Sequence, residues 1–297
     1  MFFIKTLTAS FLATSIFYQR FAGILLTLPA FMRFIIAFFA ISILAGCGGI
    51  NKILKNKDPH YKLRMAEQYY AKKKYNYAQQ VYEDVMPFFK AEKEFEDIYY
   101  KYAYTAYYQK DYLNAENLFK TYLEIFPNSA RAEEIDFMRA YTFYMQSPKP
   151  ELDQTNTIKA MNMMQIFINT HPGSTRIPEA NAIIDEARKK LEIKDYKSAQ
   201  LYFDLGQFKA AAVSFSNLLD AYPESESSAS YKLMEVRSYF RYAEMSVAGK
   251  KEERFAKVIE VANDFKDRFP ESELIKEVEE FINLSQNNLK TLTNEQT

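Results

Sequence analysis

A four-residue phrase built around proline returns four times in this chain, and no other feature constrains the fold as strongly. Proline ends a helix, and the serine two residues later is a residue type that caps the next helix. Each copy therefore marks a junction between helices, and the copies recur roughly every 50 residues, an interval typical of stacked helical repeats. They read FPNS at 126–129, HPGS at 171–174, YPES at 222–225 and FPES at 269–272.

The composition agrees with a fold made of long helices. Only 7 of the 297 residues are glycine, which leaves few of the tight turns that a sheet protein needs. The chain contains 23 Tyr and 25 Phe but no Trp, and its formal net charge is zero. A zero net charge gives no support to nucleic acid binding. We therefore expect an all-α protein whose partners are other proteins.

The first 46 residues differ in character from the rest of the chain. They contain Lys5, Arg20 and Arg33 and no acidic residue, and the apolar run 34–44 follows Arg33. A charged start, a short apolar stretch and small residues before a cleavage point are typical of a secretory signal peptide. The apolar run is too short to span a bilayer core of about 30 Å. We expect residues 1–46 to be a signal peptide.

The segment LAGC, which ends at Cys47, resembles a bacterial lipobox, and Cys47 is the only cysteine in the chain. The resemblance implies that Cys47 is acylated and becomes the first residue of the mature protein. A signal that begins at Met32 has an ordinary length, so 1–31 is interpreted as an over-called start. The alternative is that 21–44 remains as a membrane anchor, although Arg33 in its middle would cost about 3 kcal/mol.

Helical periodicity begins where Asp58 precedes a proline, a typical helix start, and then runs almost unbroken. The first two predicted helix pairs are 61–73 with 77–89 and 94–109 with 112–126. The predicted domains are a lipidated linker at 47–57, a helical repeat domain at 58–286 and a polar flexible tail at 287–297.

Small and aromatic residues alternate in these pairs at fixed spacings. The pattern resembles that of tetratricopeptide (TPR) repeats, in which small residues sit where two helices cross and aromatic residues fill the space around them. The resemblance implies a right-handed superhelix of about five hairpins, an α-solenoid. The matching residues are Ala66, Tyr69, Ala78 and Tyr82 in the first pair, Tyr99, Tyr102, Ala103, Ala115, Phe119 and Pro127 in the second, and Ala199, Tyr202, Ala211, Phe215 and Pro223 in a later pair.

The sequence offers little for catalysis. His60 and His171 are the only histidines, and neither has a Cys, Asp or Glu partner at metal-ligand spacing. There is no glycine-rich phosphate loop. We predict that the protein is not an enzyme and binds no metal or cofactor.

Tyrosine is concentrated in the segment 97–109, DIYYKYAYTAYYQ, which holds six tyrosines. A helix buries one stripe against its neighbours, so the set exceeds what one core face can hold. In the TPR resemblance Tyr100, Tyr104, Tyr107 and Tyr108 line the concave groove. The first pair adds Leu63, Glu67 and Tyr70 to that surface. Exposed tyrosines are typical of binding hot spots, which favours an extended peptide ligand. The alternative is that individual tyrosines pack against adjacent repeats.

The lipobox, the repeats with their proline turns and the loop PELDQT at 150–155 together resemble the BamD family, the TPR lipoproteins of the outer-membrane β-barrel assembly (BAM) machinery. The resemblance covers roughly 47–284. It implies a lipid-anchored outer-membrane scaffold that faces the periplasm and takes no part in nucleic acid binding. Its partners would be the periplasmic domains of a BamA-like barrel insertase and unfolded outer-membrane β-barrel proteins.

On that resemblance we expect two contact regions. Client strands would bind at Leu63, Glu67, Tyr70, Tyr100, Tyr104, Tyr107 and Tyr108, and the insertase would bind near Tyr196 and Phe203. One alternative is another periplasmic TPR lipoprotein that coordinates peptidoglycan enzymes or cell-division factors. A second is a carbohydrate-binding helical lipoprotein, which the absence of Trp and the short loops disfavour.

Overall fold

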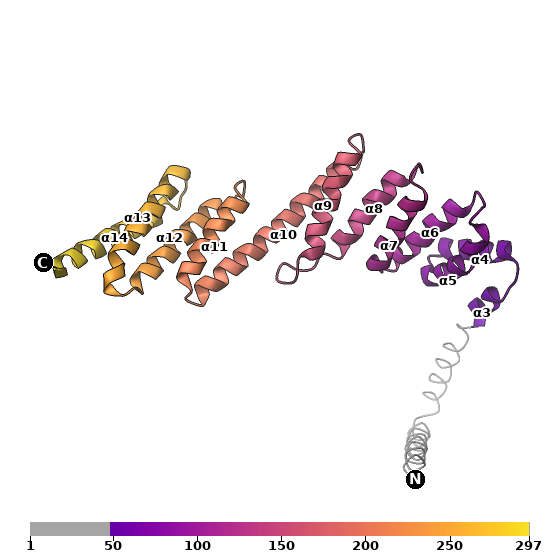
Figure 1. Ribbon diagram of the computed structural model, residues 1–297, viewed down its shortest axis with the longest axis horizontal. Helices are drawn as coiled ribbons and strands as arrows, with labels where there is room; N and C mark the ends of the chain where they lie inside the picture. The colour runs from indigo at the N-terminus through magenta and orange to yellow at the C-terminus, as the bar shows by residue number, and fades with distance from the viewer. Residues whose placement is uncertain (1–47, 297) are drawn as a thin grey trace, which may run out of the picture. The chain divides into compact units, whose positions relative to one another are not determined.

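The computed structural model describes residues 48–296, and every regular element in that range is a helix (Figure 1). The predicted all-α fold of TPR-like hairpins is confirmed. The signal peptide expected at 1–46 and the lipidation site expected at Cys47 lie outside the described residues. The α-helices are α3 (Gly48–Leu54), α4 (Pro59–Ala71), α5 (Tyr75–Val85), α6 (Phe95–Tyr108), α7 (Tyr112–Ile125), α8 (Ala132–Met145), α9 (Thr155–Thr170), α10 (Ile177–Asp204), α11 (Phe208–Ala221), α12 (Ser228–Glu244), α13 (Ala248–Arg268) and α14 (Ile275–Gln296), and the 3-10 helix η1 (Met86–Phe89) follows α5.

The chain divides between Gln109 and Lys110 into two compact units. The first unit contains the hairpin of α4 and α5, with α3 packed on both helices and α6 packed on α5. Ala66, Ala78 and Tyr82 are fully buried in this hairpin, as the TPR pattern predicts. The second predicted pair, α6 with α7, has one helix in each unit.

Residues 48–54, expected to be part of a linker, form helix α3 instead. Ile50 and Ile53 are buried in the core of the α4–α5 hairpin, and Leu54 packs at its edge. Residues three and four apart share one face of a helix, so the three side chains form an apolar stripe. This stripe fixes the start of the described chain to the first repeat.

The second unit runs from α7 to α14, and each of its helices packs on the next one in the chain. Its α10–α11 hairpin buries Ala199, Ala211 and Phe215, as the TPR pattern predicts. Tyr202 differs from that pattern, because its side chain is 45% exposed. The last hairpin is centred on the fully buried Phe255 and Phe265.

All four copies of the proline phrase adopt the same hydrogen-bonded turn, and all lie in the second unit. At 222–225, the backbone N–H of Ser225 donates to the carbonyl of Tyr222 (3.1 Å), and the Ser225 hydroxyl accepts from the N–H of Ser227 (3.1 Å). The serines thus lie two residues before the helix cap, and not at the cap position that the sequence predicted for them. The equivalent hydroxyl bonds are Ser129 with Arg131, Ser174 with Arg176 and Ser272 with Leu274.

The turns inside hairpins follow a different rule. Lys73, Lys110 and Gly206 have positive φ angles of 56°, 62° and 73° and each follows a helix end. A residue in this left-handed region lets the next N–H close back on the helix. Gln207, for example, donates to the carbonyl of Tyr202 (2.9 Å).

The C-terminal segment expected to be a polar flexible tail continues α14 as far as Gln296. Leu289 and Leu292 pack against the core cluster around Phe265. These two leucines supply the apolar contacts that extend the helix, and the polar residues between them occupy its outer face.

Candidate protein-binding surface

Six tyrosines of the first unit form a group that we call the tyrosine cluster. Its members are Tyr70 of α4, Tyr75 of α5, and Tyr100, Tyr104, Tyr107 and Tyr108 of α6. The rings of Tyr75 and Tyr108 stack with centroids 4.6 Å apart, and those of Tyr100 and Tyr104 lie 4.7 Å apart. Tyr70 contacts both Tyr75 (5.6 Å) and Tyr108 (6.3 Å) edge to face. The predicted α4 and α6 tyrosines therefore do gather in one place.

Burial within the cluster is graded. Tyr104 is only 5% exposed, whereas Tyr108 is 44% exposed. Tyr70, Tyr100 and Tyr107 are half-buried. Tyr104 is thus a core residue, and Tyr108 provides most of the aromatic surface that a ligand could contact. The sequence analysis did not include Tyr75, which falls between the predicted helices 61–73 and 77–89.

The cluster presents hydroxyl groups, and that of Tyr70 stays protonated. Burial, together with the neighbouring Tyr108 and Tyr100, raises the pKa of Tyr70 well above its ordinary value. A protonated phenol can both donate and accept a hydrogen bond. The surface therefore offers flat apolar area with neutral polar tips, a combination suited to an aromatic peptide side chain.

Glu67, a predicted client residue, belongs to a structural network. Its carboxylate accepts from the hydroxyl of Tyr82 (2.9 Å) and from Nζ of Lys101 (2.7 Å), which also pairs with Asp97 (2.7 Å). Burial alone lowers the pKa of Lys101, but the hydrogen bonds to Asp97 and Glu67 outweigh it and raise that pKa. Glu67 therefore ties α4, α5 and α6 together beside the cluster. Leu63, the remaining predicted residue, packs on the hairpin core.

In the second unit, the predicted insertase residues lie inside the α10–α11 hairpin. Tyr196 contacts the rings of Tyr231 (5.5 Å) and Phe215 (6.1 Å), and Phe203 contacts Phe208 (5.2 Å). Both predicted residues are half-buried against the hairpin core. The same helix end exposes other apolar side chains, namely Leu201, Tyr202 and Leu205. The accessible apolar surface at that end of α10 is therefore formed by these three side chains.

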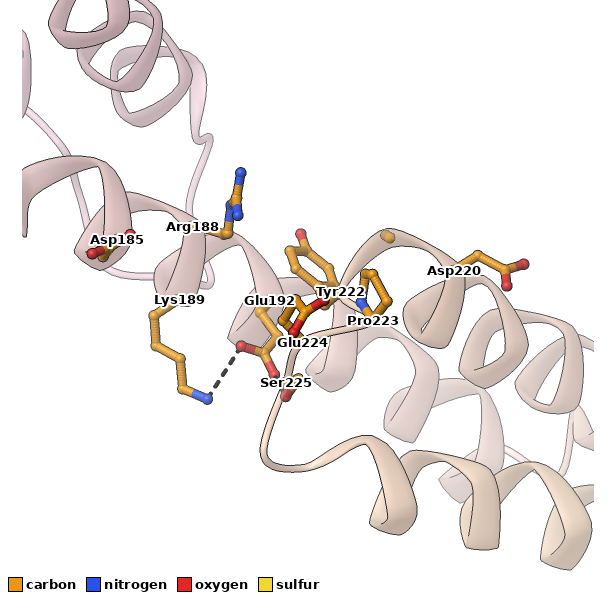
Figure 2. Close-up of a pocket in the computed structure, with 10 residues that line it drawn as sticks. Asp185, Arg188, Lys189, Glu192, Asp220, Tyr222, Pro223, Glu224 and Ser225 are labelled. Atoms are coloured by element: carbon orange, nitrogen blue, oxygen red, sulfur yellow. Dashed lines mark hydrogen bonds and ion pairs between the residues drawn. The ribbon is translucent and has the colours of Figure 1, made fainter. Parts of the chain in front are cut away.

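A pocket of about 500 Å³ with several charged residues in its lining lies between α10 and the proline turn at 222–225 (Figure 2). Sequence reasoning did not identify it. Lys189 forms an ion pair with Glu192 (3.1 Å) at its wall. The Glu192 carboxylate also accepts from the hydroxyls of Tyr231 (2.6 Å) and Ser225. Burial alone raises the pKa of Glu192, but these bonds outweigh it and lower that pKa. The pocket is lined by Asp185, Arg188, Lys189, Glu192 and 220–225.

Neither histidine lies in a cluster suited to metal binding. His171 Nε2 lies 3.2 Å from a carboxylate oxygen of Asp136, and the His60 ring packs edge to face on Phe89. Within residues 48–296 there is no group of three or more His, Cys, Asp or Glu side chains placed to hold a metal ion. In the same range, no helix combines the length and the apolar character needed to cross a membrane.

The helical hairpins and the lipobox-like segment define the class of protein, a helical-repeat lipoprotein. The model of the family described as "YfiO: Outer membrane lipoprotein" matches residues 56–257. The chain belongs to this family of outer membrane lipoproteins, and the predicted BamD-like identity is confirmed. A comparison with curated proteins gives no match.

Among solved structures, the chain is similar to the "TPR2AB-domain:pHSP90-complex of yeast Sti1". The two share 12% sequence identity, with a TM-score of 0.38. The match covers 77% of this chain and 98% of the other.

Proposed function

We propose that this protein is a non-catalytic scaffold of the outer-membrane β-barrel assembly machinery. Acyl chains on Cys47 would hold it in the outer membrane, facing the periplasm. A single acyl chain anchors a protein only marginally, and two or more give lasting attachment. Anchoring would raise the effective concentration of its partners without any new contact. Membership of a family of outer membrane lipoproteins supports this role.

The tyrosine cluster is the observation that carries the client-binding half of the proposal. Its rings already contact one another, so binding immobilises few side chains. The ligand that fits is an extended segment ending in an aromatic residue, such as the last strand of an unfolded barrel protein. The second unit would bind the periplasmic domains of a BamA-like insertase, with the exposed Leu201, Tyr202 and Leu205 at the end of α10 as contacts.

The client site is tested with a synthetic peptide that copies the last strand of an outer-membrane barrel protein and ends in Phe. Tyr108→Ala should weaken its binding at least about tenfold, equivalent to about 1.4 kcal/mol, because Tyr108 is the most exposed ring of the cluster. Tyr202→Ala is the matched control, since Tyr202 is equally exposed (45%) but lies in the second unit. Unchanged affinity of the Tyr108→Ala variant would remove the client-binding assignment.

The partner assignment needs a separate experiment. The tagged protein is extracted from membranes in mild detergent, and the proteins that co-purify are identified by mass spectrometry. A barrel protein with repeated periplasmic domains supports the scaffold role. Peptidoglycan synthases or hydrolases without such a barrel would contradict it.

A further inference from the structure

The first hairpin lies close to the residue that would carry the acyl chains. Helix α3 begins the described chain at Gly48, the residue after Cys47 (Figure 1). It buries Ile50 and Ile53 in the core of the hairpin. Three residues of extended chain span at most about 11 Å. The hairpin core therefore starts within about that distance of Cys47. An acylated Cys47 would hold one edge of the first unit against the bilayer surface.

That edge carries an exposed aromatic side chain. In η1, Phe89 is buried (3% exposed) and contacts the ring of His60 at the start of α4 (5.3 Å), whereas its neighbour Phe88 is 62% exposed. The segment 55–58 connects α3 to the same end of α4. Phe88 thus projects from the end of the hairpin where α3 joins it. Its burial would remove a large apolar side chain from water.

Exposed lysines surround this edge. Those on α3 and the following connection are Lys52, Lys55 and Lys57, and those after η1 are Lys90 and Lys93. None of the five side chains forms an ion pair within the described residues. The exposed acids of the two segments are fewer, namely Asp58, Glu92 and Glu94, and Asp58 is engaged in capping α4. The surplus of positive charge complements an anionic lipid surface.

We infer that this edge is a second membrane contact, in which Phe88 enters the interface and the lysines bind anionic lipid headgroups. The inference rests on the proposed acylation of Cys47. An acyl anchor combined with an interfacial aromatic and basic residues fixes the orientation of the first unit as well as its position. The tyrosine cluster would then keep a constant orientation relative to the membrane that receives the barrel proteins.

The absence of Trp from the chain makes a direct test possible. In Phe88→Trp the introduced indole is the only one, so its fluorescence reports on that site alone. The full-length variant is extracted from membranes and reconstituted into anionic vesicles whose lipids carry brominated acyl chains, which quench an indole inside the bilayer. Leu113→Trp is the control, because Leu113 is as exposed (66%) but lies on α7 in the second unit.

We expect brominated lipids to quench the Phe88→Trp variant and to leave the Leu113→Trp variant unchanged. Replacing Lys52, Lys55 and Lys57 with Gln in the Phe88→Trp background should reduce the quenching in anionic vesicles, and added salt should act in the same direction. No quenching of an acylated Phe88→Trp protein would overturn the inference and leave the proposed function standing. Intact mass measured on the same sample reports the acyl chains, and an unmodified Cys47 would overturn both.

Discussion

Each unit contains a glutamate whose carboxylate is paired with a tyrosine and a lysine, but the two glutamate side chains differ in solvent exposure. Glu67 in the first unit accepts from Tyr82 and Lys101, and its side chain is 37% exposed. Glu192 in the second unit accepts from a tyrosine and a lysine as well, but its side chain is only 6% exposed. The additional partner of Glu192 is Ser225, which belongs to a proline turn.

The difference follows from how the helices are joined. In the second unit Ser225 of a four-residue proline turn donates to the carboxylate on α10, whose side chain is left only 6% exposed. In the first unit the connection from α5 to α6 contains η1 and runs from Met86 to Glu94, and no serine turn covers Glu67. The proline turns join the helices of the second unit in one repeated way, and the irregular connection of the first unit instead carries the exposed Phe88. The candidate membrane contact of the first unit therefore lies where the repeat pattern is broken, whereas the tyrosine cluster lies at the other end of the hairpin, around the end of α4 and the start of α5.

The largest effect expected from this comparison is the loss of Glu192. Glu192→Ala removes the acceptor of two hydroxyls and should lower the free energy of unfolding by about 3 kcal/mol. Glu67→Ala should cost about 1 kcal/mol, because water can replace this half-exposed carboxylate. Urea unfolding followed by circular dichroism measures both, and Glu253→Ala at a 73%-exposed site is the control. Equal losses at Glu67 and Glu192 would contradict the comparison.

A smaller difference in the free energy of unfolding is expected between variants of two proline turns. Ser225 closes its turn and also donates to Glu192. Within residues 48–296, the one side-chain hydrogen bond of Ser272 is the bond that closes its turn. Ser225→Ala should therefore cost about 2 kcal/mol and Ser272→Ala about 1 kcal/mol or less, as expected for losing one neutral hydrogen bond. The same urea experiment measures the two variants. A larger loss at Ser272 would show that the link to Glu192 contributes nothing.

The sequence predicted the regular part of the fold because that part depends on local signals. Proline phrases ended helices, and alternating alanines and aromatics identified the buried faces of α5 and α11, including Tyr82 and Phe215. Helix α3 and the end of α14 were missed for a shared reason. Each depends on a few apolar residues, such as Ile53 and Leu292, that gain a partner only from tertiary packing.

The candidate site was predicted in part for the same physical reason. The resemblance to TPR repeats placed Tyr70 and Tyr108 on one surface, and the structure brings their rings together. The sequence did not predict the burial of Tyr104, because burial depends on neighbouring helices, and the periodicity of one helix does not describe them. Hydrogen bonds between distant segments, such as Tyr231 with Glu192, have no signature in the spacing of residues.

The smallest effect distinguishes two buried carboxylates of the second unit by pH. The hydrogen bonds to Glu192 lower its pKa below the ordinary 4.5, so its contribution to stability is present above pH 4.5 and is lost as the pH falls through the lowered pKa. Glu235 has the opposite sign. Burial raises its pKa despite the opposing ion pair with Lys232 (2.9 Å), so the folded state keeps a proton that the unfolded state releases. Stability should therefore fall as the pH rises from 4.5 through the raised pKa of Glu235.

Urea midpoints measured across this pH range for single glutamine variants separate the two carboxylates. Glu192→Gln should flatten the loss of stability below pH 4.5, and Glu235→Gln should flatten the loss above it. If Glu235→Gln instead steepened the fall above pH 4.5, the charged form of Glu235 would be the one that the Lys232 pair favours. The contrast would then be between two stabilised carboxylates, and burial beneath the turn would no longer distinguish Glu192.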